Sequence, residues 1–206
     1  IKKIRKDNLG RSIELISLIK KPTPGENIYL SIDKRIQFIG FNILKEYVQK
    51  FDADSASLVL IKVKSGEILA MANYPSFDPG NRSEMFGPKI QNSAASISFE
   101  PGSTIKPFTI YNALLNKTHN EKDIIKTSPG KLNIGKHEIE DYRDLGDLTL
   151  EDIIRLSSNI GAAKVSLKND KKLIYNTLQD FDFGKNLYIN LHGEQHGTLT
   201  HYSKWD

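Results

Sequence analysis

A serine and a lysine three residues apart are the residues of this chain whose types and spacing could do chemistry. Ser103 and Lys106 follow the breaker pair Pro101-Gly102, and apolar residues then recur at close to helical spacing from Ile105. Positions i and i+3 share one face of a helix, so a helix beginning at Ser103 would bring both side chains together. A serine hydroxyl becomes a good nucleophile when a base takes its proton. A lysine can be that base if burial lowers its pKa, because desolvation disfavours the charged form.

The Ser-x-x-Lys pattern alone is a weak signal, because it also begins at Ser17, Ser31 and Ser128. Ser17 lies just before a proline-rich stretch, and Ser31 ends an expected strand whose alternation points it away from the lysine. Ser128 is followed by Pro-Gly, a turn that does not place the lysine over the serine. We interpret these three serines as surface polar residues and select Ser103.

A second polar motif, Ser157-Ser158-Asn159, lies about fifty residues downstream of Ser103. It interrupts an expected helical pattern that begins after Thr149, a candidate N-cap, with Asp152 at the capping-box position. A serine hydroxyl can relay a proton, and an asparagine amide can both donate to and accept from a peptide bond. A cluster of serine and asparagine that only ends a helix is the alternative for this motif alone. The two motifs in this order favour a catalytic set.

With these motifs, the chain resembles the transpeptidase domain of class B penicillin-binding proteins, specifically the septal peptidoglycan D,D-transpeptidase of cell division. The resemblance covers nearly the whole chain. It includes residues 25–33, the block from Ser65-Gly66-Glu67 to Asp78-Pro79, both polar motifs, and the segment from Phe183-Gly184 to Trp205. Asn159 stands where elongation-type relatives often carry Asp, which favours the septal type.

The resemblance implies an α/β (α+β) fold of the penicillin-binding transpeptidase and serine β-lactamase type. That fold is an antiparallel sheet with flanking helices and a helical subdomain. No Lys-Thr-Gly or Lys-Ser-Gly follows Asn159, so we expect a piece truncated before this third motif, incomplete at its C-terminus. Residues 1–24 are expected to be a linker or the end of a preceding N-terminal domain. Residues 25–206 are expected to be the N-terminal part of the transpeptidase domain, without its C-terminal strands.

The resemblance also implies roles for Ser103, Lys106, Ser157 and Asn159. Ser103 would attack the penultimate D-Ala carbonyl of a peptidoglycan stem peptide, with Lys106 as base and Ser157 as proton relay. Ser103, Ser157 and Asn159 would contact the substrate, and β-lactam antibiotics would acylate the same Ser103. No cofactor and no metal is implied. A D,D-carboxypeptidase or β-lactamase of the same fold, or a non-catalytic remnant that only binds partners, remain alternatives.

The composition is that of an ordinary globular piece. In 206 residues, 38% are hydrophobic and 26% charged, enough for one sizeable domain. The net charge of +4 is densest near the N-terminus and otherwise interleaved, which argues against nucleic-acid binding. The absence of Cys excludes disulfides and thiol chemistry. By resemblance, partners would be cell-division proteins. The protein would face the periplasm or the outer side of the bacterial cytoplasmic membrane through an anchor absent from this chain.

Two other clusters invite functional interpretations. His192, His196 and His201 lie near Glu194, but intervening glycines interrupt the helix that would align them, and the spacing is not that of a known zinc motif. The carboxylates at 140, 141, 144 and 147 lie in a loop without an apolar frame that would shift a pKa. We interpret them as solvated turn residues, with Asp141, which matches a family position, in a structural role.

Periodicity and turn signals predict the following elements. They are a strand at 28–33, a helix at 34–51, a hairpin of strands at 57–63 and 67–72, a helix at 103–115, short strands at 131–134 and 137–139, and helices at 149–156, 160–167 and 172–179. The run Leu58-Val59-Leu60-Ile61 is apolar without alternation, which is typical of a strand covered on both faces. The family's remaining strands would follow residue 206, so we expect this surface to be exposed in the chain itself.

Overall fold

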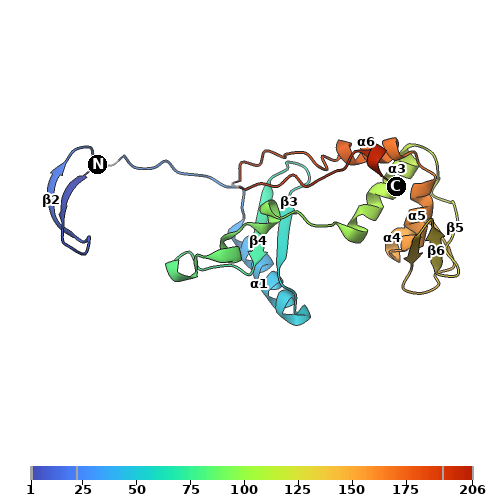
Figure 1. Cartoon of the computed structure of the whole chain (residues 1–206), viewed down its shortest axis with the longest axis horizontal. Coiled ribbons are helices and arrows are strands. Elements are labelled where there is room, and N and C mark those ends of the chain that lie inside the picture. Colours follow the sequence, from blue (N-terminus) through green and yellow to red (C-terminus); the bar gives the residue numbers. More distant parts are fainter. Residues whose placement is uncertain (1, 22, 192, 206) are drawn as a thin grey trace.

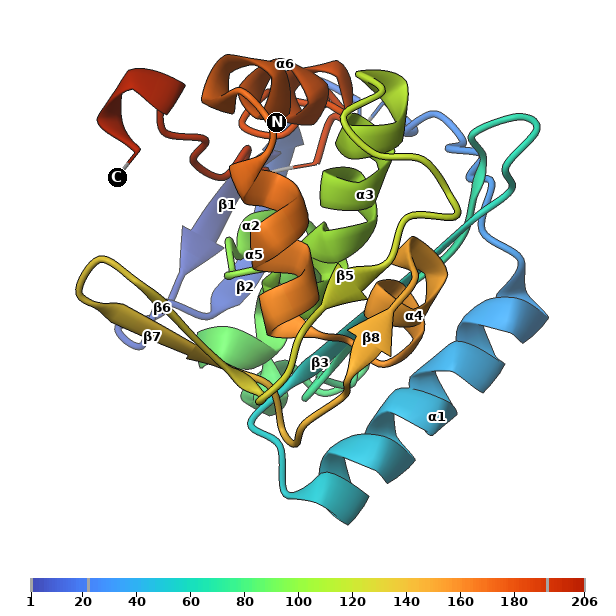
Figure 2. The same cartoon turned by 90° about the vertical axis from the view of Figure 1, so that its right-hand side faces the viewer.

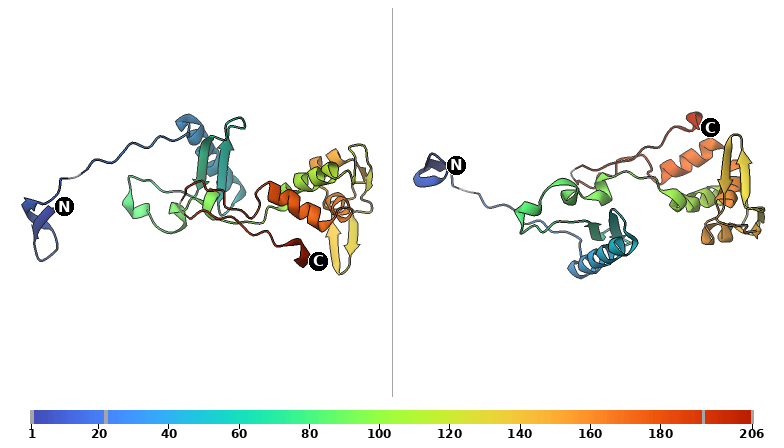
Figure 3. Two further views of the ribbon diagram at one scale, coloured as in Figure 1. Left: turned by 90° about the horizontal axis from the view of Figure 1, so that it is seen from above. Right: turned by 60° about the horizontal axis from the view of Figure 1, so that its bottom comes forward.

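The computed structural model describes residues 2–21, 23–191 and 193–205, and its elements fall into three parts along the long axis (Figure 1). The first part is an antiparallel hairpin of β1 (Lys2–Lys6) and β2 (Ser12–Leu18). It lies at the end of an extended segment, away from the rest of the chain, in both views of Figure 3. No strand was predicted here, because this charged segment was interpreted as a linker or the end of a preceding domain. The domain boundary at residue 25 stays a prediction.

The second part, which we call the sheet module, packs one helix on one hairpin. Helix α1 (Lys34–Phe51) begins after Asp33, whose carboxylate accepts from the N–H groups of the first turn. The buried residues Gly40, Leu44 and Val48 form one stripe of α1 at four-residue spacing. This stripe covers the antiparallel pair of β3 (Ala56–Ile61) and β4 (Ile68–Tyr74). The helix and the hairpin were both predicted, and the strand ends shift by one to two residues.

One strand expectation for the sheet module is wrong. Residues 28–33 form no strand: the segment is extended but pairs with β4 through only one backbone bond, Asp33 N–H to Leu69 O at 2.9 Å. Apolar side chains of β3 are exposed in this chain, as predicted. Val59, Leu60 and Ile61 are 40–52% exposed, because the described sheet has two strands and α1 covers one face.

A series of short turns leads from β4 to the next part of the chain. These are the 3₁₀ turns η1 (Arg82–Glu84) and η2 (Gly87–Ile90), followed by α2 (Ser93–Ser96). Asn73 at the end of β4 anchors α2, because its Oδ1 accepts from Ser93 Oγ at 3.1 Å and from Ala94 N–H at 2.8 Å. The segment after α2 leads along the chain to Ser103, the candidate nucleophile.

The third part, the helical module, contains most of the core. Its helices are α3 (Lys106–Leu115), α4 (Leu150–Arg155), α5 (Asn159–Leu167) and α6 (Lys171–Asp180). Two small antiparallel pairs, β5 (Ile125–Lys126) with β8 (Asp147–Leu148) and β6 (Lys131–Ile134) with β7 (His137–Glu140), lie beside α4 and α5 (Figure 2). Ala113, Ile153 and Val165 are fully buried between α3, α4 and α5. All these helices were predicted, with α3 beginning three residues later than expected.

The last segment leaves α6, runs back toward α2 and then returns to α6 (Figure 1). Gln195 N–H donates to Ala95 O at 2.8 Å at the far point of this excursion. On the return, the 3₁₀ turn η4 (Tyr202–Lys204) and its neighbours pack on Tyr175 of α6 through ring contacts with His201, Tyr202 and Trp205. The segment therefore closes over both α2 and α6.

Candidate active site

The turn that enters α3 carries Ser103. It is a 3₁₀ turn, η3 (Gly102–Ile105), and Lys106 is the first residue of α3. Gly102 has φ 55°, a left-handed conformation that glycine adopts without strain. Pro107 fits in the first turn of α3, where its missing N–H leaves no intrahelical bond unmade. Ser103 is exposed, whereas Lys106 is only 7% exposed, so the two residues differ sharply in their access to water.

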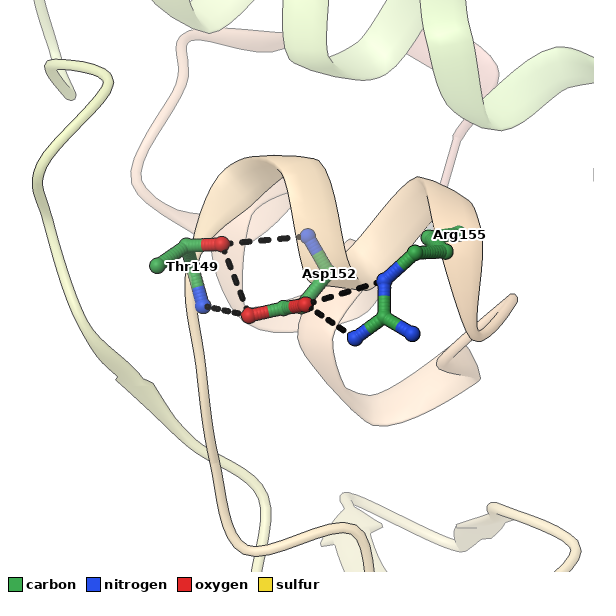
Figure 4. A network of polar contacts seen from close by, with 3 residues as sticks. All are labelled: Thr149, Asp152 and Arg155. Carbon is green, nitrogen blue, oxygen red and sulfur yellow. Dashed lines mark hydrogen bonds and ion pairs between the residues drawn. The ribbon is translucent and has the colours of Figure 1, made fainter.

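Helix α4 presents the second motif at its end. Its start is fixed by the predicted capping box, in which Thr149 Oγ1 accepts from Asp152 N–H and the Asp152 carboxylate accepts from Thr149 N–H (Figure 4). Arg155 pairs with the same carboxylate, at 2.5 Å. The helix ends at Arg155, and the chain turns through Ser157, which has φ 55°. Ser158 then caps α5, since its Oγ accepts from Gly161 N–H at 2.8 Å.

The four residues selected from the sequence meet at this connector. Lys106 Nζ donates to Ser157 O at 2.5 Å, to Ser157 Oγ at 3.0 Å and to Asn159 Oδ1 at 2.7 Å. Ser157 Oγ donates to Ser103 Oγ at 3.0 Å. Within the described residues, hydrogen bonds therefore join Ser103 to Lys106 through Ser157 and not directly. Proton transfer needs contacts of this length, about 2.6–3.2 Å.

The charge of Lys106 is the main electrostatic feature of the site. Burial lowers the pKa of Lys106, and the negative charge of Asp141 partly opposes that effect. An ammonium has three donors, and the three hydrogen bonds of Nζ all go to uncharged oxygens. A lysine in these surroundings loses its proton more readily than an exposed one, which is what a base for Ser103 requires.

Two further residues hold the site in place. Asp141 was expected to have a structural role, and its carboxylate accepts hydrogen bonds from Ser158 Oγ and from the N–H groups of Asn159 and Ile160, which agrees with that role. Ser158 was treated as the middle of a motif, yet it is completely buried. The signal for Asp141 was its match to a family position. For Ser158, no signal in the sequence separated it from Ser157.

The other three Ser-x-x-Lys serines are bonded elsewhere or exposed, which confirms their interpretation as surface polar residues. Ser17 lies exposed on β2. Ser31 Oγ donates to Ile68 O at 2.7 Å, and Ser128 Oγ donates to Asp144 Oδ1 at 2.8 Å. The lysine after Ser128, Lys131, pairs with Glu138 and Glu140.

The histidine cluster gives no metal centre within the part of the chain that the structure describes. No three His, Cys, Asp or Glu side chains there are grouped so that they could hold an ion. His192 lies outside the described residues. His201 is engaged in ring contacts with Tyr175 and Tyr202.

Comparison with known proteins places this chain in a family. Residues 56–205 match the family model described as penicillin binding protein transpeptidase domain. The chain is 39% identical over 196 residues to the probable peptidoglycan D,D-transpeptidase PbpC of Pseudomonas aeruginosa, which covers 95% of this chain and 35% of that protein. It is 36% identical over 202 residues to the peptidoglycan D,D-transpeptidase FtsI of Escherichia coli, covering 98% of this chain and 34% of that protein.

A solved structure agrees with this assignment. The transpeptidase domain of penicillin-binding protein 3 from Burkholderia pseudomallei superimposes with a TM-score of 0.76 at 30% identity, over 89% of this chain and 51% of that chain. The chain therefore belongs to the penicillin-binding protein transpeptidase domain family and has its mixed α/β fold, as the sequence motifs predicted. It spans about a third of the length of the curated relatives that it matches.

Proposed function

We propose that this chain carries the nucleophile, base and proton relay of a serine-type peptidoglycan D,D-transpeptidase. The observation that carries the proposal is the unbroken path of hydrogen bonds from Lys106 Nζ through Ser157 Oγ to Ser103 Oγ. It joins an exposed hydroxyl to a buried amine whose pKa is lowered by burial. The substrate that we propose is the D-Ala-D-Ala end of a stem peptide, and the names of the relatives PbpC and FtsI, peptidoglycan D,D-transpeptidases, support this choice.

The reaction begins when neutral Lys106 takes the hydroxyl proton of Ser103, directly or through Ser157. Ser103 Oγ then bonds to the penultimate D-Ala carbonyl carbon, and the negative charge moves onto the carbonyl oxygen. Collapse of this intermediate breaks the peptide bond, and the terminal D-Ala leaves as an amine with a proton returned through Ser157. The amine of a second stem peptide attacks the resulting ester and gives a proton to neutral Lys106. The new amide bond forms the cross-link, the ester C–O bond breaks, and Lys106 returns the proton to Ser103 Oγ.

The developing oxyanion needs hydrogen-bond donors aimed at it. The backbone N–H of Ser103 lies at the start of η3 and α3, where helix dipoles favour negative charge. The Asn159 amide is held in place, because its Oδ1 accepts from Lys106 and its Nδ2 donates to Glu140 O at 2.9 Å. A β-lactam presents a reactive carbonyl to the same Ser103 and would acylate it.

The further expectations are proposals of the same kind. Residues 25–206 belong to the transpeptidase domain, and residues 1–24 are its connection to a preceding domain. The protein works on the outer face of the bacterial cytoplasmic membrane with cell-division partners, held by a segment outside this sequence. In the part of the chain that the structure describes, no helix has both the length and the apolar character needed to cross a bilayer.

The test is the release of D-Ala from a pentapeptide donor by the full-length protein, with and without a D-amino acid as acceptor. We expect acceptor-dependent formation of the exchanged product, and its loss in Ser103→Ala. Release that yields only hydrolysed peptide with every acceptor tried would favour a carboxypeptidase. Rapid turnover of a chromogenic cephalosporin would favour a β-lactamase. A folded wild type with no release and no β-lactam adduct would leave only the non-catalytic alternative.

A further inference from the structure

The carboxylate of Asp141 lies against the connector between α4 and α5. Asp141 follows β7 directly, and its Oδ2 accepts from Ser158 Oγ at 2.7 Å. Its Oδ1 accepts from the backbone N–H of Asn159 at 2.5 Å and from that of Ile160 at 3.2 Å. The backbone of Asp141 is itself fixed, since its N–H donates to Gly130 O at 3.1 Å. One carboxylate therefore ties the cap and the first two residues of α5, which directly follow Ser157, to the β6–β7 pair.

The backbone conformation of the connector between α4 and α5 has to be stabilised by contacts with other parts of the chain. Ser157 has φ 55°, a left-handed conformation that is strained for a non-glycine residue and persists only when its surroundings impose it. In this conformation both the carbonyl and the hydroxyl of Ser157 accept hydrogen bonds from Lys106 Nζ. A relaxed connector would separate these two contacts and break the path to Ser103.

Asp141 is also the carboxylate that acts on the Lys106 ammonium. Its charge raises the pKa of Lys106 against the larger, opposite effect of burial. The neighbouring carboxylates are paired with other cations. Glu140, which precedes Asp141, pairs with Lys131, and Asp152 of α4 pairs with Arg155. Asp141 makes no ion pair within 4 Å among the described residues, so its charge is available to the site.

We propose that Asp141 is a positioning residue, whose carboxylate holds Ser157 in its bridging conformation and balances the charge of the buried Lys106. It does not touch the substrate and acts through Ser158, Asn159 and the lysine. The inference deepens the proposed function and rests on it. A carboxylate that only capped α5 would affect stability alone, whereas this role links Asp141 to the rate of acylation and to its dependence on pH.

The experiment measures the rate of Ser103 acylation by a fluorescent penicillin between pH 5 and pH 10 in the full-length protein. Asp141→Asn keeps an oxygen for the N–H groups of Asn159 and Ile160 but removes the charge. Asp141→Ala removes both the accepting oxygen and the charge. The matched control is Asp144→Asn, an exposed aspartate of the same loop that accepts from Ser128 Oγ and Gly146 N–H and makes no contact with the connector.

In wild type the rate should rise with pH as Lys106 loses its proton. In Asp141→Asn this rise should move to lower pH, because the anion that favours the charged lysine is gone. Its plateau rate should stay within about tenfold of wild type, since the Asn oxygen can still accept hydrogen bonds. In Asp141→Ala the plateau should fall by about 100-fold, within the usual range for losing a positioned proton-transfer group. Asp144→Asn should match wild type in both respects.

An Asp141→Asn profile that stays in place or moves to higher pH would overturn the inference. So would a folded Asp141→Ala with the wild-type plateau. If Asp141→Ala does not fold, the profile of Asp141→Asn decides alone. Failure of the proposed function looks different, because wild type itself would then be unlabelled or would be labelled independently of Ser103. A wild type labelled at Ser103 with unaffected Asp141 variants would remove this inference and leave the proposed function standing.

Discussion

The sheet module and the helical module differ in how completely their apolar side chains are buried. In the helical module, Ile153, Val165 and Ala113 are enclosed on all sides by neighbouring helices. In the sheet module, α1 covers one face of a two-stranded sheet, and Val59 and Ile61 remain exposed. The four candidate site residues all lie in or next to the closely packed helices of the helical module. Groups that must hold distances of about 3 Å are best placed on rigid, fully packed elements.

The contrast extends to the polar residues of the two modules. Lys106 is a buried lysine whose three donors are directed at oxygens of Ser157 and Asn159. Lys62, in the turn of the sheet module, makes an exposed pair with Glu67 at 3.2 Å. An exposed ion pair contributes about 0–1 kcal/mol to stability. The two lysines therefore differ in importance because of where they lie, and not because of their residue type. The same difference can be tested in both modules, one pair of variants at a time.

The largest expected effect concerns these two lysines. Lys106→Ala should slow acylation by a β-lactam by about 10³-fold or more, because it removes the base and the group that holds Ser157 and Asn159. Lys62→Ala should leave the rate unchanged. The measurement is the second-order rate constant of labelling by fluorescent penicillin. Equal rates in wild type and Lys106→Ala would mean that another group activates the serine.

The next effect concerns isoleucines in the two modules. Ile153→Ala should lower the free energy of unfolding by about 2–5 kcal/mol, because it leaves a cavity in a closed core. Ile61→Ala in the 206-residue chain should cost less than about 1 kcal/mol, as for other exposed positions. Urea unfolding followed by circular dichroism measures both. A large cost for Ile61→Ala in a longer form of the protein would show that chain outside this sequence covers β3. A large cost in this chain itself would contradict the contrast.

A smaller effect is expected at one helical glycine in each module. A Cβ on Gly161 would lie 2.6 Å from Ile153 Cγ1, whereas a Cβ on Gly40 would meet Leu58 Cδ2 at 3.3 Å. Gly161→Ala should therefore destabilise the protein by about 1–3 kcal/mol through overpacking and should disturb Ser158. Gly40→Ala should be close to neutral, because the gain of up to about 1 kcal/mol in helix propensity offsets a mild contact. Thermal unfolding of both variants checks the order, and a more damaging Gly40→Ala would reverse our view of the two modules.

The smallest effects concern stability in alkaline solution. Burial lowers the pKa of Lys106, so between that value and the ordinary 10.5 the unfolded chain binds more protons, and stability rises with pH. The pKa of Lys131 is raised by hydrogen bonds to Glu140 and Glu138. Its contribution is therefore present below the ordinary value and is lost as pH rises through the raised one. Lys106→Met should remove the contribution that makes stability rise with pH. Lys131→Met should remove the contribution that makes stability fall with pH. Unfolding curves at several alkaline pH values measure both slopes, and slopes of the same sign would refute this assignment.

Much of the helical module could be predicted from sequence because its signals are local. The capping box of Thr149 and Asp152 and the Pro-Gly pair before Ser103 fix element ends through neighbouring residues. The juxtaposition of Ser103 with Ser157 could be inferred only from the family resemblance, because the two lie 54 residues apart. Spacing along a helix also suggested a direct contact between Ser103 and Lys106. In the structure the hydrogen bonds between these two residues run through Ser157 instead.

Other features depend on contacts with residues far away in the sequence, and local patterns could not predict these. The exposure of Leu60 and Ile61 was predicted from the family resemblance, because no pattern within β3 specifies what lies over it. Residues 28–33 alternate as a strand should, yet they make too few backbone bonds with β4 to form one. The role of Asp141 also depends on distant contacts, since its partners Ser158 and Asn159 are 17 and 18 residues away.

The most direct test of the account is to locate the acyl group after the full-length protein reacts with benzylpenicillin. Proteolysis and mass spectrometry identify the modified peptide. We expect the added mass on the peptide that contains Ser103, with no adduct on the peptides of Ser17, Ser31 or Ser128, and none anywhere in Ser103→Ala. An adduct on a different serine, or one that persists in Ser103→Ala, would show that the path from Lys106 through Ser157 to Ser103 is not the catalytic one.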